Sequence, residues 1–87
     1  MSISIYDSSE VGKRIQQLRK TYGYTRELFS EKIGISPKFL YEIEKGLKGF
    51  SVQILFHISR ELHTTCDYIV LGIELRNYDE ELRKTLA

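Results

Sequence analysis

The chain has 87 residues, of which 41% are hydrophobic and 29% charged, as is ordinary for one small globular domain. We expect a single domain without room for a separate ligand-sensing domain. The net charge of +1 is uneven, because residues 10–48 carry nine Lys/Arg against five Glu, a net +4, and the remainder carries four against seven, a net −3. Because Cys66 is the one cysteine, an internal disulfide is excluded. With no apolar run of bilayer length and no signal-peptide pattern, we expect a cytoplasmic protein without a membrane anchor.

The first helix is expected near residue 8. Residues 1–6 alternate polar and apolar side chains, which fits either a short strand or an ordered arm, and we assign residues 1–9 to an N-terminal arm. Asp7 or Ser8 is a candidate N-cap, and Gly23 is a stop signal. Spacings of three and four residues predict a buried face made of Val11, Ile15, Leu18 and Tyr22.

Residues 25–46 predict two short helices joined by a sharp turn. Thr25 is expected to cap the first helix, Gly34 to end it with a positive φ, Ser36 to cap the second, and Pro37 to occupy its first turn. The expected inward side chains are Leu28, Phe29 and Ile33 in the first helix and Leu40 and Ile43 in the second. This is the pattern of a helix-turn-helix, whose second helix enters the DNA major groove.

Two further helices are predicted before residue 73. Ser51 is expected to cap the first of them, with Phe56 away from its apolar stripe as an extra core or interface residue. The second is capped by Thr64 or Thr65 and ended by Gly72. The buried stripe of the first comprises Val52, Leu55, Ile58 and Leu62.

The tail, residues 73–87, carries a pattern for one more helix, with Asn77 as its cap. Its apolar residues recur at spacings of three and four, so something must cover them. We expect the tail either to pack across a dimer partner or to fold back on the domain. These apolar residues are Leu75, Tyr78, Leu82 and Leu86.

The order of these motifs resembles the lambda-repressor/Cro type (XRE family) of helix-turn-helix domain over about residues 10–72. The resemblance implies an all-α fold, a compact five-helix lambda-repressor-like DNA-binding domain. The C-terminal helix predicted above would follow this domain. It also implies a partly buried salt bridge between Arg19 and Glu44. The alternative is that Arg19 is an ordinary solvated arginine. The motifs that carry the resemblance are Val11–Ile15, Leu18–Lys20, the helix-turn-helix closed by Ile43–Gly46, and Asp67–Ile69.

The outward face of the predicted second helix supplies the candidate DNA contacts. Lys38 suits guanine O6/N7, and Glu42 suits the cytosine amino group unless it is simply solvated. Phe39 either meets a thymine methyl or packs on a neighbouring element. Arg26 stands where the family usually has a glutamine that touches a phosphate and supports the second helix. The full candidate set is Thr25, Arg26, Ser36, Pro37, Lys38, Phe39, Tyr41, Glu42, Lys45 and Lys48.

Relatives of this type often form dimers around the last helix of the domain. That helix is apolar beyond one face, which favours self-association, although part of the excess fills the core. Cys66 is most simply a small buried hydrophobe. The candidate dimer residues are Cys66, Tyr68, Ile69, Leu75, Tyr78, Leu82 and Leu86.

The leading hypothesis is a transcriptional regulator, a repressor, that binds double-stranded DNA in a sequence-specific manner as a homodimer on a pseudo-palindromic operator. The alternative is an antitoxin or adaptor that mainly binds a partner protein. We expect no enzymatic activity, cofactor or metal, because no paired carboxylates, activated nucleophile or phosphate loop is present. His57 and His63 have no ligand-type neighbours at useful spacing.

Overall fold

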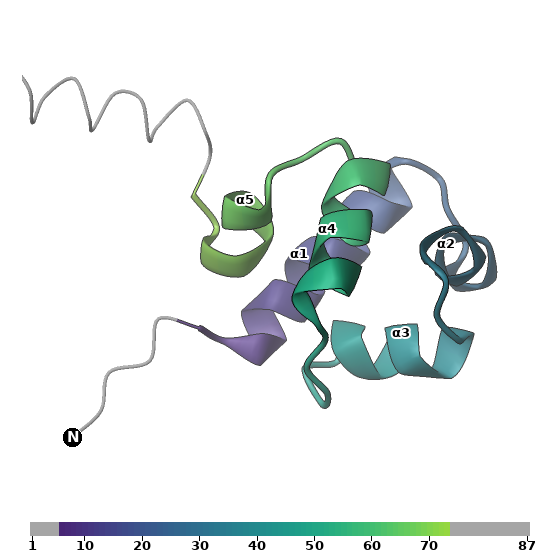
Figure 1. The fold of residues 1–87 in the computed structure, drawn as a ribbon, viewed down its shortest axis with the longest axis horizontal. Coiled ribbons are helices and arrows are strands. Elements are labelled where there is room, and N and C mark those ends of the chain that lie inside the picture. Colours follow the sequence, from purple (N-terminus) through teal and green to yellow (C-terminus); the bar gives the residue numbers. More distant parts are fainter. Residues whose placement is uncertain (1–5, 74–87) are drawn as a thin grey trace, which may run out of the picture.

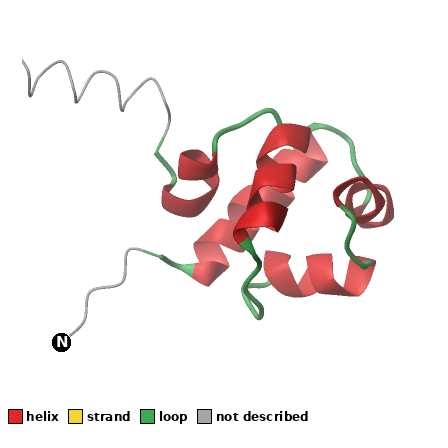
Figure 2. Ribbon diagram, in the orientation of Figure 1, coloured by secondary structure: helices red, strands yellow, loops and turns green. Residues whose placement is uncertain are grey.

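A computed structural model describes residues 6–73. The apolar residues predicted for the tail helix, Leu75, Tyr78, Leu82 and Leu86, lie outside that range. The described part consists of helices and loops (Figure 2), which confirms the all-α fold with five helices. The long α1 and α4 lie at the centre, with α2 and α3 on one side and α5 on the other (Figure 1). The helices are α1 (Ser8–Thr21), α2 (Arg26–Ile33), α3 (Pro37–Glu44), α4 (Val52–Glu61) and α5 (Cys66–Leu71).

Each helix begins where a side-chain oxygen caps it. A free backbone N–H in the first turn needs an acceptor, and a short polar side chain at the N-cap supplies one. The sequence left the caps of the first and last helices open between two neighbouring residues each. In the structure Asp7 caps α1 and Thr65 caps α5. Because α1 starts at Ser8, its first turn overlaps the region that we assigned to the N-terminal arm. The five N-caps are Asp7, Thr25, Ser36, Ser51 and Thr65.

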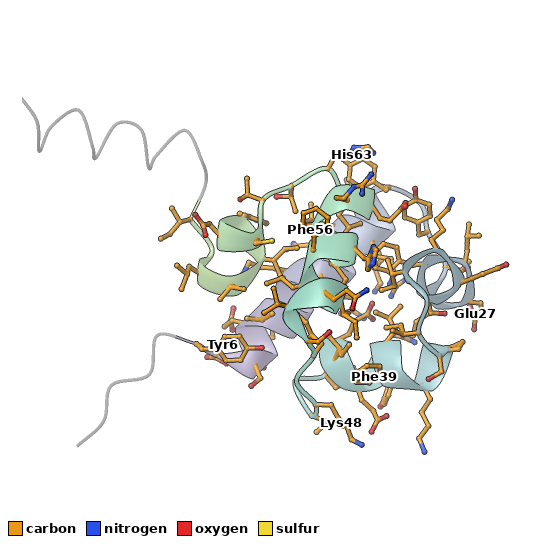
Figure 3. The ribbon with its side chains drawn as sticks, in the orientation of Figure 1. Tyr6, Glu27, Phe39, Lys48, Phe56 and His63 are labelled. Atoms are coloured by element: carbon orange, nitrogen blue, oxygen red, sulfur yellow. The ribbon has the colours of Figure 1, made fainter. Side chains whose placement is uncertain are left out.

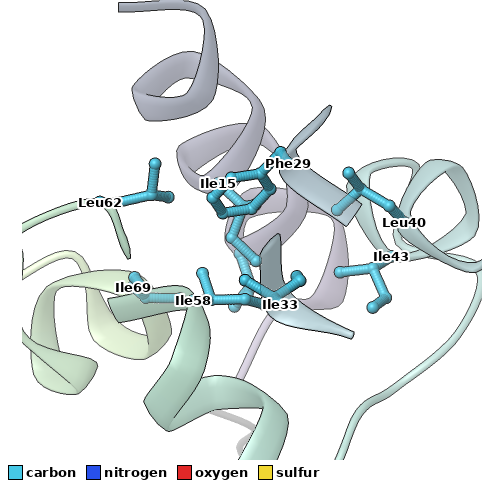
Figure 4. Packing of buried hydrophobic residues seen from close by; sticks show 9 residues of the cluster. Ile15, Phe29, Ile33, Leu40, Ile43, Ile58, Leu62 and Ile69 are labelled. Atoms are coloured by element: carbon cyan, nitrogen blue, oxygen red, sulfur yellow. The ribbon is translucent and has the colours of Figure 1, made fainter. Parts of the chain in front are cut away.

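One hydrophobic core joins all five helices (Figure 4). Every helix contributes at least one fully or nearly fully buried apolar side chain, so no helix packs independently of the others. Burial of such side chains is worth roughly 1.5–3 kcal/mol each. The core residues are Val11, Ile15, Phe29, Ile33, Leu40, Ile43, Ile58, Leu62 and Ile69.

Three residues predicted to be buried are instead exposed. Val52 is 82% exposed. A step of three residues along a helix falls about 60° short of a full turn, so two such steps from Ile58 back to Val52 place Val52 away from the buried face. Leu28 faces solvent because Phe29 and Ile33 define the buried side of α2. Tyr22 is exposed because α1 ends at Thr21 and leaves it as the C-cap. Phe56, placed outside the stripe by the sequence, is exposed and not part of the core.

Gly12 sets the distance between α1 and α3. A Cβ at this position would collide with the backbone carbonyl oxygens of Ile43 and Glu44, so only glycine allows the two helices to approach this closely. Gly46 extends the contact, because a Cβ there would lie 2.8 Å from the Cα of Ser9. The last turn of α3 and the chain after it are therefore held directly against the first half of α1.

Candidate nucleic-acid interface

The helices α2 and α3 form a helix-turn-helix. Gly34 ends α2 with a φ of 79°, a left-handed conformation that favours glycine. The Ile35 N–H donates to the Ser30 carbonyl at 3.0 Å, and the Ile35 side chain packs against the core. Ser36 then caps α3 by accepting from the Phe39 N–H at 3.0 Å. The predicted elements of residues 25–46 are thus present in the predicted order.

The α3 helix has a buried face and a polar outward face. Leu40, Ile43 and Glu44 are buried, whereas the residues between them point away from the core. Phe39 is partly buried against the core, so packing explains the presence of an aromatic side chain at this position. Figure 3 shows Phe39 on α3 and Lys48 on the loop that follows it. The outward candidates are Pro37, Lys38, Tyr41 and Lys45, which are exposed, and Glu42, which is partly exposed.

A buried ion pair ties α1 to the end of α3. Arg19 Nε donates to Glu44 Oε2 at 2.7 Å, and Arg19 Nη2 donates to Oε1 at 3.1 Å. Arg19 Nη1 also donates to the Tyr24 carbonyl at 2.8 Å, and the Glu44 side chain is 0% exposed. The salt bridge that the resemblance implied is therefore present, in the bidentate geometry that gives a strong, directional contact.

Arg26 joins the same carboxylate from α2. Its Nε donates to Glu44 Oε1 at 3.1 Å, and its guanidinium carbon lies 5.2 Å from the centre of the Tyr41 ring. Lys45 Nζ also lies near this ring, 5.8 Å from its centre. Arg26 thereby supports α3. Its side chain is still 30% exposed. The sequence analysis named Arg26 as a candidate DNA contact, at a position where the family usually has a glutamine, but gave no signal for this pairing with Glu44.

Lys48 reaches back from the loop to α3. Its Nζ lies 3.7 Å from Glu42 Oε2. The chain turns at Gly46, whose φ is 75°, and the Leu47 N–H donates to the Glu42 carbonyl at 2.8 Å. The sequence analysis named Lys48 and Glu42 as separate candidate DNA contacts and did not predict that the two would meet.

Arg14 is a further structural residue that the sequence did not single out. Its Nε donates to the Ile69 carbonyl at 2.9 Å, and its Nη2 donates to the Val70 carbonyl at 3.1 Å. A cation that binds the last carbonyls of a helix also interacts favourably with the helix dipole. Arg14 therefore fixes the end of α5 on α1.

The α5 residues proposed for a dimer interface behave differently from one another. Ile69 is fully buried in the core of one chain, so its assignment to an interface was wrong. Tyr68 and Cys66 are partly buried, and Cys66 Sγ lies 3.5 Å from Ser59 Oγ. Cys66, which we expected to be a small buried hydrophobe, is thus only partly buried.

Residues 6–73 form neither a candidate metal site nor a membrane-spanning helix. No group of three or more His, Cys, Asp or Glu residues that could hold a metal ion occurs there. Over the same span, no helix is long and apolar enough to cross a bilayer. His63, two residues after the end of α4, has a φ of 52°, and its ring centre lies 5.5 Å from that of Tyr22.

Known proteins share this sequence pattern. The helix-turn-helix family model HTH_3 matches residues 15–69. The HTH-type transcriptional regulator YazB of Bacillus subtilis is 39% identical over 56 residues, which cover 64% of this chain and 81% of YazB. The HTH-type transcriptional regulator SinR of Bacillus subtilis is 32% identical over 73 residues, which cover 83% of this chain and 66% of SinR. The chain therefore spans slightly less than two thirds of SinR.

Solved structures share the fold. SinR in complex with DNA matches with a TM-score of 0.64 and 33% identity, over 68% of this chain and 95% of that chain. The SinR/SinI complex matches with a TM-score of 0.66 and 26% identity, over 88% of this chain and 79% of that chain. Because the family model covers more than half of the chain and the folds agree, this protein belongs to the HTH_3 family of helix-turn-helix proteins, of the lambda-repressor and Cro type.

Proposed function

We propose that this protein is a transcriptional regulator that binds double-stranded DNA by inserting α3 into the major groove. The observation that carries the proposal is the division of α3 into a polar outward face and an inner face locked by the Glu44 ion network. A rigid helix presented in this way needs little ordering when it binds. The structure of the relative SinR was solved in complex with DNA, which supports DNA binding by this chain.

The charges around α3 suggest separate roles for its neighbours. Lys38 projects from the first turn of α3 and is the best candidate for guanine O6/N7. Arg26 and Lys45 flank the exposed Tyr41 ring and would bind backbone phosphates, with Tyr41 donating a hydrogen bond. The N-termini of α2 and α3, with Thr25, Ser36 and Pro37, would lie toward phosphates because helix N-termini favour anions.

A homodimer acting as a repressor completes the proposal. Two copies would place their α3 helices in successive major grooves, so half-sites would lie about 34 Å apart on a pseudo-palindromic operator. Exposed or half-exposed apolar residues near α5, with Tyr68 and Leu71 among them, supply surface for self-association. The predicted tail helix would add to that interface.

A pair of lysine substitutions tests the DNA-binding role. Lys38→Ala should alter the preferred base at one position of each half-site, with a loss of about 1–3 kcal/mol for the preferred sequence. Lys20→Ala is the matched control, since Lys20 is an exposed lysine in the last turn of α1, on a different helix. Binding would be measured by fluorescence anisotropy on duplexes at one fixed salt concentration. Equal losses for the two variants would contradict the proposed role of Lys38.

An adaptor or antitoxin that mainly binds a protein is the second candidate. It is favoured by the exposed Val52 and Phe56 on α4 and by the solved complex of the relative SinR with SinI. Under this alternative, a folded protein would bind all duplexes weakly and without preference at physiological salt. Sequence-selective binding in the anisotropy experiment would reject it as the main function.

A further inference from the structure

The loop lysine and the α3 carboxylate form one unit. We propose that Glu42 accepts a hydrogen bond from a cytosine amino group and that Lys48 is a positioning residue, which acts through Glu42 instead of binding a phosphate independently. This inference rests on the proposed function, since it requires α3 to lie in the major groove. It assigns base selectivity to a side chain outside the helix-turn-helix itself.

The loop geometry holds the two side chains together. The left-handed Gly46 and the hydrogen bond from the Leu47 N–H to the Glu42 carbonyl, at 2.8 Å, return the chain toward α3. Lys48 Nζ then lies 3.7 Å from Glu42 Oε2. The Glu42 side chain is 20% exposed and that of Lys48 is 60% exposed, so the carboxylate is the more confined partner.

The neighbouring cations are engaged elsewhere. Arg26 is hydrogen-bonded to Glu44, and the Lys45 ammonium lies over the Tyr41 ring. Lys48 is therefore the cation that the structure places beside Glu42. Lys38 lies one helical turn before Glu42 on α3 but forms no ion pair with it among the described residues. Removal of Lys48 would therefore leave the Glu42 carboxylate without its ion-pair partner.

Electrostatics explain why a carboxylate on this face needs a cation beside it, and the hydrogen-bonding groups of the bases determine which base it prefers. An unpaired carboxylate near phosphates is repelled, whereas the pair with Lys48 has no net charge. In the major groove a carboxylate can accept only from the amino groups of cytosine and adenine. Adenine presents its N7 acceptor next to that amino group, which repels a carboxylate, so cytosine fits better. Guanine O6 and thymine O4 are acceptors and are rejected.

The exposed position of Lys48 predicts little effect on folding. Solvent-exposed ion pairs contribute at most a small amount to stability. A variant at Lys48 should therefore melt like the wild-type chain while changing which base is preferred. This separates a positioning role from a structural one.

The test is a set of binding curves for the full chain on duplexes carrying each of the four bases at every half-site position, at one fixed salt concentration. Glu42→Ala should reduce the preference for cytosine at one position by about fivefold or more. Lys48→Met should reduce the preference at that same position, and the double variant should lose little beyond either single variant. Lys48→Arg should restore the preference, because it returns the positive charge.

Two results would overturn the inference while leaving the proposed function intact. In one, Lys48→Met weakens binding to all duplexes equally. The slope of log K against log salt also becomes less steep by about one unit, as expected for the loss of one phosphate contact. In the other, Glu42→Ala changes no base preference. A wild-type chain that binds every duplex equally would instead overturn both the proposed function and this inference.

Discussion

Glu44 is the residue on which the geometry of α3 most depends. It is a fully buried carboxylate that accepts hydrogen bonds from Arg19 of α1 and Arg26 of α2. The resemblance to the family implied the first partner. It did not imply the second, because Arg26 replaces a glutamine and the reach of its side chain across the turn depends on the fold. Pairings between an element and a loop, such as that of Lys48 with Glu42, likewise have no fixed sequence spacing.

Glu44→Ala tests how much this ion network contributes to the free energy of unfolding. The substitution leaves the buried Arg19 guanidinium without its counter-charge, so we expect the free energy of unfolding to fall by about 3 kcal/mol. Urea denaturation followed by circular dichroism measures the change. Glu31→Ala, at an exposed position of α2, is the control and should lie within about 0.5 kcal/mol of the wild type. Equal midpoints for the two variants would show that the ion network contributes nothing.

Arg26→Gln separates the supporting role of Arg26 from its proposed phosphate contact. Glutamine can still hydrogen-bond to Glu44 but carries no charge. We expect the plot of log K against log salt to become less steep by about one unit, with sequence preference unchanged. Lys20→Gln removes an exposed charge from α1 and should leave the slope unchanged. An unaltered slope for Arg26→Gln would mean that Arg26 acts only as a structural support.

Among the elements, helix ends were more predictable than helix faces. The caps Asp7, Thr25 and Ser36 act locally, because each side chain bonds to an N–H two or three residues away. The buried side of a helix depends on which partner it meets, and short helices leave the phase of the apolar stripe poorly determined. Val52 and Leu28 were assigned to the core for this reason. The close crossing of α1 and α3 also had no sequence signal beyond a glycine.

Gly12→Ala tests that crossing. The added methyl group would collide with two backbone carbonyl oxygens that cannot rotate away, so α1 and α3 must separate. We expect a loss of about 3 kcal/mol in the free energy of unfolding, as for a tightly overpacked site. Thermal unfolding is the measurement.

Gly49→Ala is the matched control for this substitution. A Cβ at Gly49 meets no atom within 4 Å, and the residue lies in the loop after α3. We expect its melting temperature to match that of the wild type. If Gly12→Ala melted at the same temperature as Gly49→Ala, the close approach of α1 and α3 would not be a constraint on the fold.

At the scale of the whole molecule, one surface is polar and basic while another retains apolar side chains. Arg26, Lys38, Lys45 and Lys48 surround the outward face of α3, which belongs to the positively charged part of the sequence. Elsewhere Phe56 and other apolar residues remain exposed in a single chain. A protein with this distribution suits the binding of an anionic duplex at one surface and of a second copy at another.

Truncation after Gly72 tests the contribution of the tail. If the tail packs across a partner, the shortened chain should sediment as a monomer and the full chain as a dimer. If the tail folds back on its own domain, the shortened chain should instead unfold at lower urea concentration. Sedimentation velocity and urea unfolding distinguish the two cases, and no change in either would contradict both.

The central claim is sequence-specific DNA binding, and selection from a randomised duplex pool tests it most directly. The purified full chain would be incubated with the pool at fixed salt, and the retained duplexes would be sequenced. The account predicts enrichment of an inverted repeat whose half-sites lie about 34 Å apart, one helical turn of DNA. No enrichment from a protein that circular dichroism shows to be folded would contradict it and favour a protein partner.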